Sequence, residues 1–363
     1  MPDRRHLLLL GGGHAHVEVL RQLGQNPLSG WRVTLLTREE MSPYSGMLPG
    51  VIAGLYRPEQ ALIDMPALTA RSGVELLLDH CTGIDPRAKQ VRRAGGADLA
   101  WDLLSIDTGA TPDTSRTPGA AAHALPLKPI DALLPRMREI TEAAQAGQRI
   151  VVVGGGAAGF EVACALAVRL PASVTLVAGA SGLLPGFPDG LRRRAARALL
   201  RHGVALTEGH NVARVEDGLV HMEDAAPLPA TAVIWATGAA SAPWLAETGL
   251  ARDARGFLRV DTCLRAEGHD AIFAAGDVAS FPDPLPKAGV FAVRQGPVLA
   301  ANLRAVAMGE APQPYVPQQD YLRLLSLADG RALGTRNGFV FGGRWVWWLK
   351  DRIDRRFIAR YQN

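Results

Sequence analysis

The sequence predicts an α/β protein with two three-layer domains of similar design, each built on a parallel sheet, plus a small C-terminal region. Two observations lead to this fold class. A glycine-rich turn between an apolar strand and a helical pattern occurs twice, at residues 11–13 and 154–159, and about 143 residues separate the two turns. A second apolar strand follows each pattern, so each turn belongs to a β-strand–helix–β-strand unit. The 363 residues are enough for two or three domains.

Composition restricts the class of protein. Hydrophobic residues make up 48% of the chain and charged residues 20%, as in ordinary globular proteins. The net charge of +4, from 39 basic and 35 acidic residues, is too small to indicate a nucleic-acid partner. Three cysteines without a close pair are typical of a reducing compartment and give no disulfide framework.

The first residues, MPDRRHLLLL, imitate a signal peptide. Their apolar run is shorter than the roughly 7–15 residues that an export signal needs. No stretch of the chain approaches the ~20 apolar residues of a membrane span. We therefore expect a cytoplasmic protein.

The first glycine turn follows the apolar run Leu7–Leu10, which is typical of a buried central strand. Gly11 and Gly13 match the first two positions of GxGxxG, the turn that lets a dinucleotide's pyrophosphate rest on a helix N-terminus. His16 occupies the third glycine position. Thr37 stands at the end of the next strand, where an acid normally holds a ribose. The turn predicts a Rossmann-like domain, although its pattern is incomplete.

Two histidines open the helix after this turn. His14 and His16 lie two residues apart, about 200° around a helix, so they do not converge on one metal ion. We expect His16 to pack against the sheet and His14 to form a local hydrogen bond. The alternative is that His14, with the neighbouring Ala15, contacts a bound cofactor.

The second turn is complete. In QRIVVVGGGAAGFEVACAL, the glycine positions are filled by Gly154, Gly156 and Gly159. Ala178 replaces the acid at the end of the following strand, and the arginines of residues 192–194 come shortly after it. The turn predicts a second Rossmann-like domain and leaves the choice between NADH and NADPH open.

Later strands end in small residues, which allow the backbone to lie close to a nucleotide. Thr108 and Gly109 end one such strand, Gly238 follows another, and Gly276 precedes Asp277 at the end of a third. An aspartate at that edge can hydrogen-bond a sugar alcohol such as the ribityl chain of a flavin. A helical pattern starts near residue 291, and its N-terminus can stabilise negative charge on a reduced flavin.

In this order, GGGHAH, TGATP, GGGAAGFE, ATG, AGD and VRQG resemble the two-dinucleotide-binding-domain flavoproteins, the pyridine nucleotide-disulfide oxidoreductase family. The resemblance covers nearly the whole chain. It implies an FAD domain at residues 1–114 and 266–312, an inserted NAD(P)H domain at 115–265 and a C-terminal region at 313–363. It also implies that FAD is held by Gly11, Gly13, Thr108, Gly109 and Asp277, and that NADH or NADPH lies on Gly154, Gly156 and Gly159.

Within the family, the sequence is most similar to the branch that contains type II NADH dehydrogenases and sulfide:quinone oxidoreductases. More narrowly, GGGHAHV, YSGMLPG and RWVWWLKDRIDRRFI resemble a flavoprotein module fused to selenide, water dikinase. No kinase domain follows, so we expect a stand-alone member or a separated module.

The cysteines depart from the disulfide reductases of the family, which need two cysteines facing the flavin. Cys164 is expected to be a buried hydrophobic residue. Without a redox disulfide, electrons leave the flavin directly for a quinone-like acceptor. Two alternatives stay open: an enzyme that handles sulfide or selenium compounds through a cysteine near the flavin, and a flavin-bearing sensor or partner-binding protein.

The resemblance also implies roles for further residues. Glu161 matches a family glutamate that orients the nicotinamide or relays a proton, although an acid there also favours the helix dipole. Lys128 either neutralises flavin or phosphate charge or is a solvated linker residue. Arg294 and Gln295 are expected to hydrogen-bond the flavin ring, and the loop that starts at Tyr44 is expected to border it.

Residues 344–361 predict an amphipathic helix. Its apolar face recurs every four residues, and its opposite face is basic. This pattern favours packing on the protein's own core or on a partner subunit, as in a homodimer. The alternative is peripheral contact with the inner face of the cell membrane. The apolar face consists of Trp345, Leu349, Ile353, Phe357 and Tyr361, and Lys350 and Asp354 are expected on the opposite face.

Overall fold

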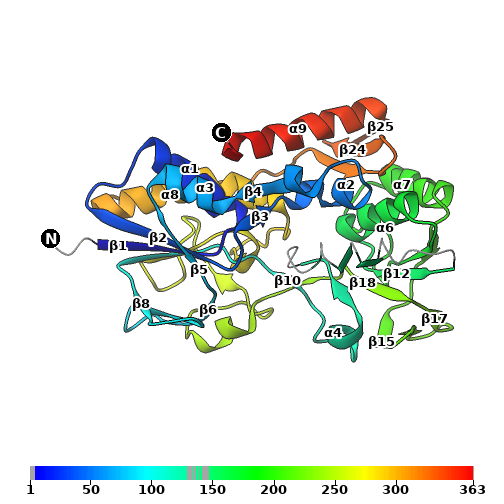
Figure 1. Ribbon diagram of the computed structural model, residues 1–363, viewed down its shortest axis with the longest axis horizontal. Helices are drawn as coiled ribbons and strands as arrows, with labels where there is room; N and C mark the ends of the chain where they lie inside the picture. The colour runs from blue at the N-terminus through cyan, green and yellow to red at the C-terminus, as the bar shows by residue number, and fades with distance from the viewer. Residues whose placement is uncertain (1–4, 129–132, 134–135, 138, 141–146, 363) are drawn as a thin grey trace.

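The computed structural model describes residues 5–128, 133, 136–137, 139–140 and 147–362. Two five-stranded parallel sheets lie side by side (Figure 1). Helices cover one face of each sheet, and a small antiparallel sheet covers the other. The predicted fold class, two three-layer α/β units with a C-terminal region, is confirmed.

The first sheet has the order β21-β9-β1-β2-β5. Its central strand β1 (Arg5–Leu10) is buried from the second residue on, as the continuous leucine run predicts. Three helices lie on the upper face in Figure 1 and the antiparallel strands β6 to β8 on the lower. The other strands are β2 (Trp31–Thr37), β5 (Glu75–Leu78), β6 (Cys81–Asp85), β7 (Gln90–Arg93), β8 (Leu99–Ala100), β9 (Leu103–Ile106) and β21 (Ile272–Ala274), and the helices are α1 (His14–Gln25), α3 (Met65–Ser72) and α8 (Gly289–Met308).

The second sheet has the order β11-β18-β12-β13-β14 and repeats this design. Helix α6 follows the second glycine turn and packs against the sheet, together with α7 and the short helix α2 from the first half of the chain. The strands are β11 (Leu125–Pro126), β12 (Arg149–Val153), β13 (Ser173–Val177), β14 (Ala205–Thr207) and β18 (Ala232–Trp235), with β15 (Val212–Glu216), β16 (Leu219–Met222) and β17 (Leu228–Pro229) on the other face. The helices are α2 (Leu48–Ile52), α4 (Ala120–His123), α6 (Ala157–Arg169) and α7 (Asp189–Arg201).

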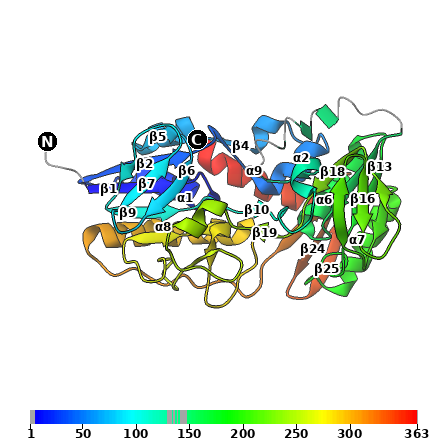
Figure 2. The same ribbon diagram turned by 90° about the horizontal axis from the view of Figure 1, so that it is seen from below.

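The chain crosses between the two units through an antiparallel pair, β10 (Thr111–Pro112) with β19 (Ala239–Ala240), and both views place this pair between the sheets (Figures 1 and 2). After β19, Leu245, Leu250 and Leu258 pack in the core of the first sheet. We therefore propose that the second domain ends near residue 240 and not at 265, because the apolar side chains that follow are buried in the first unit.

The C-terminal region joins the two units. Strands β23 to β25 form an antiparallel sheet, from which Leu325 and Leu333 enter the second core. Helix α9 (Arg344–Gln362) runs from β25 across to the first unit, where Ile358 and Tyr361 are buried (Figure 1). No helix among the described residues is long and apolar enough to cross a bilayer. The strands are β23 (Arg323–Ser326), β24 (Ala332–Arg336) and β25 (Phe339–Gly343).

Short elements complete the fold. They connect the larger elements and border the edge of the sheets where the glycine turns lie. They are β3 (Met41–Pro43), β4 (Leu62–Asp64), β20 (Leu258–Arg259), β22 (Ala279–Ser280) and the 3-10 helices η1 (Ser45–Met47), η2 (Pro58–Ala61), η3 (Pro243–Glu247) and η4 (Gly276–Val278).

Candidate functional site

The amino end of α1 lies against the carboxyl end of β9, and the first glycine turn allows this approach. Gly11 has a φ of +91°, and a Cβ there would lie 2.5 Å from the carbonyl oxygen of Asp107. Gly13 precedes α1, and a Cβ there would lie 2.3 Å from the carboxyl carbon of Asp107. Both positions therefore require glycine, and the helix N-terminus behind them is suited to an anion.

The second glycine turn repeats this geometry at the amino end of α6. Gly154 has a φ of +127°. A Cβ at this position would lie 2.6 Å from the carbonyl oxygen of Ala236 and would clash with it. A Cβ on Gly159 would lie 1.9 Å from the Gly154 carbonyl oxygen, so glycine permits close packing of helix on turn. Gly156, by contrast, faces open space, which leaves room for a phosphate beside the helix N-terminus.

Asp107 is a buried acid that was not among the predicted site residues. Its carboxylate accepts hydrogen bonds from the backbone N–H of Ala15 at 2.8 Å and of His16 at 3.0 Å. Burial raises the pKa of Asp107 to about 7, although these two donors oppose the shift. The signal was the aspartate in LLSIDTG, which follows an apolar strand directly before the small residues of the turn.

The two histidines of α1 differ. His16 is fully buried; its Nδ1 lies 2.7 Å from the Gly11 carbonyl oxygen and its Nε2 lies 2.8 Å from Ser105 Oγ, so packing against the sheet is confirmed. His14 does not form the expected local hydrogen bond: its Nε2 is buried without a partner among the described residues, and its ring packs on Tyr44 and Phe357. Burial lowers the pKa of both histidines to about 4, so both are neutral at neutral pH.

The structure brings Lys128 and Asp277 together. Lys128 Nζ lies 2.9 Å from Asp277 Oδ2, beside the carboxyl edge of the first sheet. Next to them, the backbone N–H of Gly276 donates to Gln295 Oε1 at 2.6 Å, which fixes the start of η4 against α8. Arg294, the neighbour of Gln295, is exposed and is not brought to this group.

The remaining predicted binding residues follow the ends of parallel strands. Thr37 ends β2 and is buried beside the first glycine turn. A Cβ added to Gly12 would lie 3.1 Å from the Thr37 Oγ1 atom. Thr108 is exposed, and Gly109 has a φ of +71°. Gly238 is exposed after β18. All of these lie at the edge where Rossmann-like folds bind ligands.

Glu161 lies on the second turn of α6 and is partly buried. Its Oε1 accepts a hydrogen bond from the backbone N–H of Ser326, in β23, at 2.7 Å. Burial raises the pKa of Glu161 to about 7, while the positive charge of Lys350 lowers it. Glu161 is therefore a carboxyl group able to exchange a proton near neutral pH.

Lys350 and Asp354, on α9, form a second buried polar group, and neither was predicted to have a role in the site. Lys350 Nζ donates to the Gly46 carbonyl oxygen at 2.7 Å and pairs with Asp354 Oδ2 at 2.7 Å. Tyr44 donates its hydroxyl to Asp354 Oδ1 at 3.2 Å, and its ring is the one that touches His14. Buried polar contacts thus link α9 to the Tyr44 loop, and the charge of Lys350 also acts on Glu161 of α6.

This network corrects the predicted orientation of α9. The buried side of the helix carries the charged pair Lys350 and Asp354, which the sequence placed on the outer face. Trp345 and Ile353, expected on the buried face, are 57% and 42% exposed. The two opposite charges compensate each other, and their further hydrogen bonds to the Tyr44 loop make their burial acceptable.

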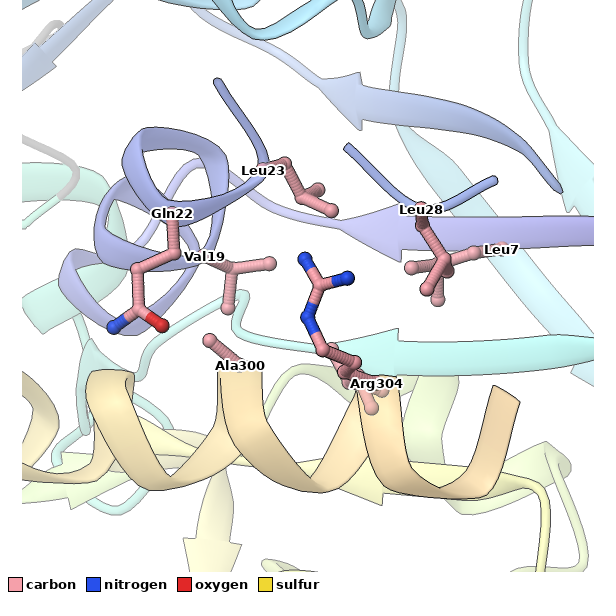
Figure 3. A pocket seen from close by; sticks show the side chains of 8 residues that line it. Leu7, Val19, Gln22, Leu23, Leu28, Ala300 and Arg304 are labelled. Atoms are coloured by element: carbon pink, nitrogen blue, oxygen red, sulfur yellow. The ribbon is translucent and has the colours of Figure 1, made fainter. Parts of the chain in front are cut away.

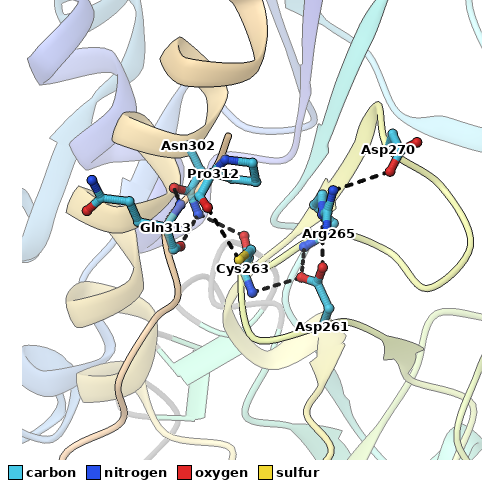
Figure 4. Close-up of polar contacts among 7 residues, drawn as sticks. All are labelled: Asp261, Cys263, Arg265, Asp270, Asn302, Pro312 and Gln313. Carbon is cyan, nitrogen blue, oxygen red and sulfur yellow. Dashed lines mark hydrogen bonds and ion pairs between the residues drawn. The ribbon is translucent and has the colours of Figure 1, made fainter. Parts of the chain in front are cut away.

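The three cysteines lie within the described residues and are free thiols. Cys164 is fully buried in the core of the second unit, as expected. Cys81 donates to the Gly83 carbonyl oxygen, and burial raises its pKa to about 11. Cys263 donates to the Pro312 carbonyl oxygen, in a cluster that ties the chain after α8 to residues 261–265 (Figure 4). Each thiol therefore has a separate structural environment.

A cavity between α1 and α8 does not compete with the glycine turns as a binding site. It lies between Val19, Leu23 and Ala300, and the Arg304 side chain reaches into it (Figure 3). Its volume of about 20 Å³ suits about one water molecule. A dinucleotide needs the open edges of the two sheets.

The fold and the paired glycine turns define a protein with two dinucleotide-binding units. The family model of pyridine nucleotide-disulphide oxidoreductases matches residues 5–296, so the chain belongs to this family. The chain is 26% identical to the type II NADH:quinone oxidoreductase of Staphylococcus saprophyticus over 390 aligned positions, which cover 99% of this chain and 96% of the relative.

Two solved structures show the same fold. NDH2 from Plasmodium falciparum, in complex with NADH, superposes with a TM-score of 0.87 at 14% identity and covers 99% of this chain and 98% of that one. The sulfide:quinone oxidoreductase of Aquifex aeolicus superposes with a TM-score of 0.81 at 18% identity and covers 99% and 92%. The resemblance seen in the sequence is confirmed, and the protein is an oxidoreductase that uses FAD and a nicotinamide nucleotide.

The residues of the first unit fit FAD. The N-terminus of α1 can stabilise a diphosphate, Asp277 can accept hydrogen bonds from ribityl hydroxyls, and Lys128 places a positive charge beside them. His14 Nε2, at the start of α1, has no partner in the part of the chain that the structure describes and offers a further polar contact. In the second unit, the open face of Gly156 fits the nicotinamide nucleotide.

Proposed function

We propose that the protein oxidises NADH or NADPH and delivers two electrons to a quinone-like acceptor without a redox disulfide. The reaction balances as NADH, a proton and a quinone giving NAD⁺ and a quinol. Bound FAD supplies the two-electron chemistry that links the two substrates. The full-length similarity to a type II NADH:quinone oxidoreductase supports this acceptor class.

The observation that carries the proposal is the position of Glu161. The carboxyl group follows the second glycine turn on α6, the turn assigned to the nicotinamide nucleotide. Its pKa of about 7 means that it is part protonated at neutral pH. Reduction of a quinone requires protons, and the Glu161 carboxyl can supply one.

The buried network has a further role in this proposal. Tyr44 donates to Asp354, and Lys350 donates to the Gly46 carbonyl oxygen and to Asp354. These bonds hold the C-terminal helix against the Tyr44 loop, which follows β3, and the Tyr44 ring packs on His14 at the first glycine turn. Such positioning is what a direct transfer between two bound cofactors requires.

The three thiols support direct transfer in preference to sulfur or selenium chemistry. A sulfide-handling enzyme of this family would need a cysteine facing the flavin. Cys164 is enclosed in the second core, and Cys81 and Cys263 donate to carbonyl groups elsewhere. None of these contacts involves the residues assigned to FAD.

Anaerobic stopped-flow spectroscopy of the purified yellow protein tests the proposal. We expect NADH or NADPH to bleach the flavin rapidly and quinones from a panel to reoxidise it. Replacement of each cysteine by alanine serves as the matched control and should leave both phases unchanged. Bleaching by sulfide alone, or loss of turnover in a cysteine variant, would assign the protein to the sulfur-handling alternative.

We further propose that α9 places the enzyme on an anionic membrane surface, where quinones are found. Trp345 and Trp348 are 57% and 62% exposed, and Ile353 is also exposed. Arg352, next to it, is exposed and lies over the Trp348 ring at 5.6 Å. Exposed tryptophans with arginines are typical of helices that lie in the membrane interface.

A further inference from the structure

The Asp107 carboxyl lies at the N-terminus of α1, the helix end that suits a diphosphate. Its Oδ2 accepts the N–H groups of Ala15 and His16, which are among the first donors of α1. Its Oδ1 lies towards Gly276, and a Cβ on Gly276 would lie 2.5 Å from this oxygen. The side chain is 2% exposed and is enclosed between α1, β9 and η4.

A bound diphosphate and an ionised Asp107 oppose each other. Both are negatively charged, and both are stabilised by the same helix N-terminus. Since Asp107 is buried, solvent screens the repulsion only weakly. A protonated carboxyl removes this repulsion and gains an O–H group that can donate to a phosphate or ribityl oxygen.

The other charged groups around Asp107 are few. The negative charge of Asp277, in η4, raises the pKa of Asp107. The positive charge of Lys128, which is paired with Asp277, lowers the pKa of Asp107. The two histidines of α1 are neutral above pH 5, because burial lowers the pKa of each to about 4. The residues of α8 on this side, Ala292 and Gln295, carry no charge.

We propose that Asp107 makes FAD binding proton-linked: the carboxyl binds a proton when FAD binds and releases it when FAD leaves. Asp107 is then a cofactor-binding residue in its protonated form. The carboxyl belongs to this chain's own glycine-turn site, and the proposal does not depend on the electron acceptor.

The sign of the effect follows from linkage. Burial raises the pKa of Asp107 to about 7 in the FAD-free protein, and the charge of the diphosphate raises it further when FAD binds. Below pH 6 the carboxyl is protonated in both states, so binding is insensitive to pH. Above pH 7 the free protein must take up a proton in order to bind, so affinity falls by about tenfold per pH unit.

Dilution of the holoprotein tests the proposal, because released FAD is measured directly by its fluorescence. We expect the Kd for FAD to be constant between pH 5.5 and 6.5 and to rise about tenfold per unit between pH 7.5 and 9. In weakly buffered solution with a pH indicator, each FAD released at pH 8.5 should release about one proton. Asp107→Asn keeps the shape of the side chain and should abolish both effects.

Two control variants separate Asp107 from other groups. Asp102→Asn removes an aspartate that accepts a backbone N–H at the opposite end of β9, and it should keep the pH dependence. Lys287→Gln removes a nearby group that titrates in this range, since burial lowers the pKa of Lys287 to about 8 and its charge interacts with that of Asp277. This variant should also keep the slope.

The outcomes are distinct. A Kd that is independent of pH in the natural protein, or an Asp107→Asn variant that retains the slope, overturns the proposal. A slope that disappears in Lys287→Gln overturns it as well, because the lysine then accounts for the effect. If Asp107→Asn does not fold, the proton count of the natural protein decides: a value near zero excludes the proposal, while one proton per FAD that persists in Lys287→Gln supports it.

Discussion

Lys350 and Asp354 form an ion pair inside the protein, one helical turn apart on α9, with Nζ 2.7 Å from Oδ2 and side chains only 8% and 5% exposed. Burial opposes the positive charge of Lys350, but the nearby carboxylates of Asp354 and Glu161 raise its pKa overall. The pair connects the C-terminal helix to the Tyr44 loop, and its lysine lies near enough to Glu161 of α6 for each charge to shift the pKa of the other.

Breaking this pair should destabilise the fold. Lys350→Met leaves Asp354 buried without its cation, and we expect a loss of about 3–5 kcal/mol in the free energy of unfolding. Replacing both residues, with Asp354→Leu added, should recover much of this loss because no unpaired charge remains. Urea unfolding followed by intrinsic fluorescence measures both variants. A single variant as stable as the natural protein would show that the pair does not hold α9 in place.

Glu161→Gln should slow reduction of the acceptor. The amide cannot exchange a proton, so we expect turnover with quinone to fall by about 100-fold, while reduction of the flavin by NADH changes much less. Steady-state and stopped-flow rates measure the two steps. Equal losses in both steps would assign Glu161 to orienting the nicotinamide and not to proton transfer.

The pH profile of the natural enzyme gives a second test of Glu161. Burial raises its pKa to about 7, so the carboxyl is protonated below pH 7 and ionised above it. If it donates a proton, the rate of flavin reoxidation by quinone falls as the pH rises through about 7. Measurements with FAD held in excess keep occupancy constant. The inflection should be absent in Glu161→Gln, and an unchanged profile would contradict the assignment.

Lys128→Met should weaken the retention of FAD modestly. It removes the cation paired with Asp277, but the Lys128 side chain is 42% exposed, and solvent screens such a pair. We expect a loss of about 1 kcal/mol, or roughly fivefold in Kd, by the fluorescence of released flavin. Arg87→Met, at an exposed turn after β6, is the control. A loss equal to that of the control would make Lys128 a solvated linker residue.

Trp348→Ala should weaken binding to membranes. We expect at least roughly tenfold less association with vesicles that contain anionic lipid, and a similar loss for Trp345→Ala, because both rings would lie in the interface. Co-sedimentation measures the effect, and Met308→Ala, another exposed apolar residue, is the control. A different result would assign this face to a homodimer: the natural protein does not bind vesicles but self-associates, and Trp348→Ala abolishes the self-association.

The sequence alone determined much of the fold because its strongest signals are local. The run Leu7–Leu10 and the turns at Gly11 and Gly154 act within one β-strand–helix–β-strand unit, where glycine is required by the backbone itself. The two turns together with TGATP, ATG, AGD and VRQG, in this order, carried the resemblance to the family. The strand that was predicted to end at Thr37 is β2, which ends at that residue.

Only the tertiary structure decided which side chains meet. Lys128 reaches Asp277 across 149 positions of sequence, and Glu161 reaches the backbone of Ser326 across 165. The burial of Lys350 contradicted the helical pattern, because a charge can face inward when a long-range partner compensates it. Asp107 is the clearest case: its neighbours in sequence identify a strand end, but its proximity to the N-terminus of α1 arises only when distant strands pair in the sheet.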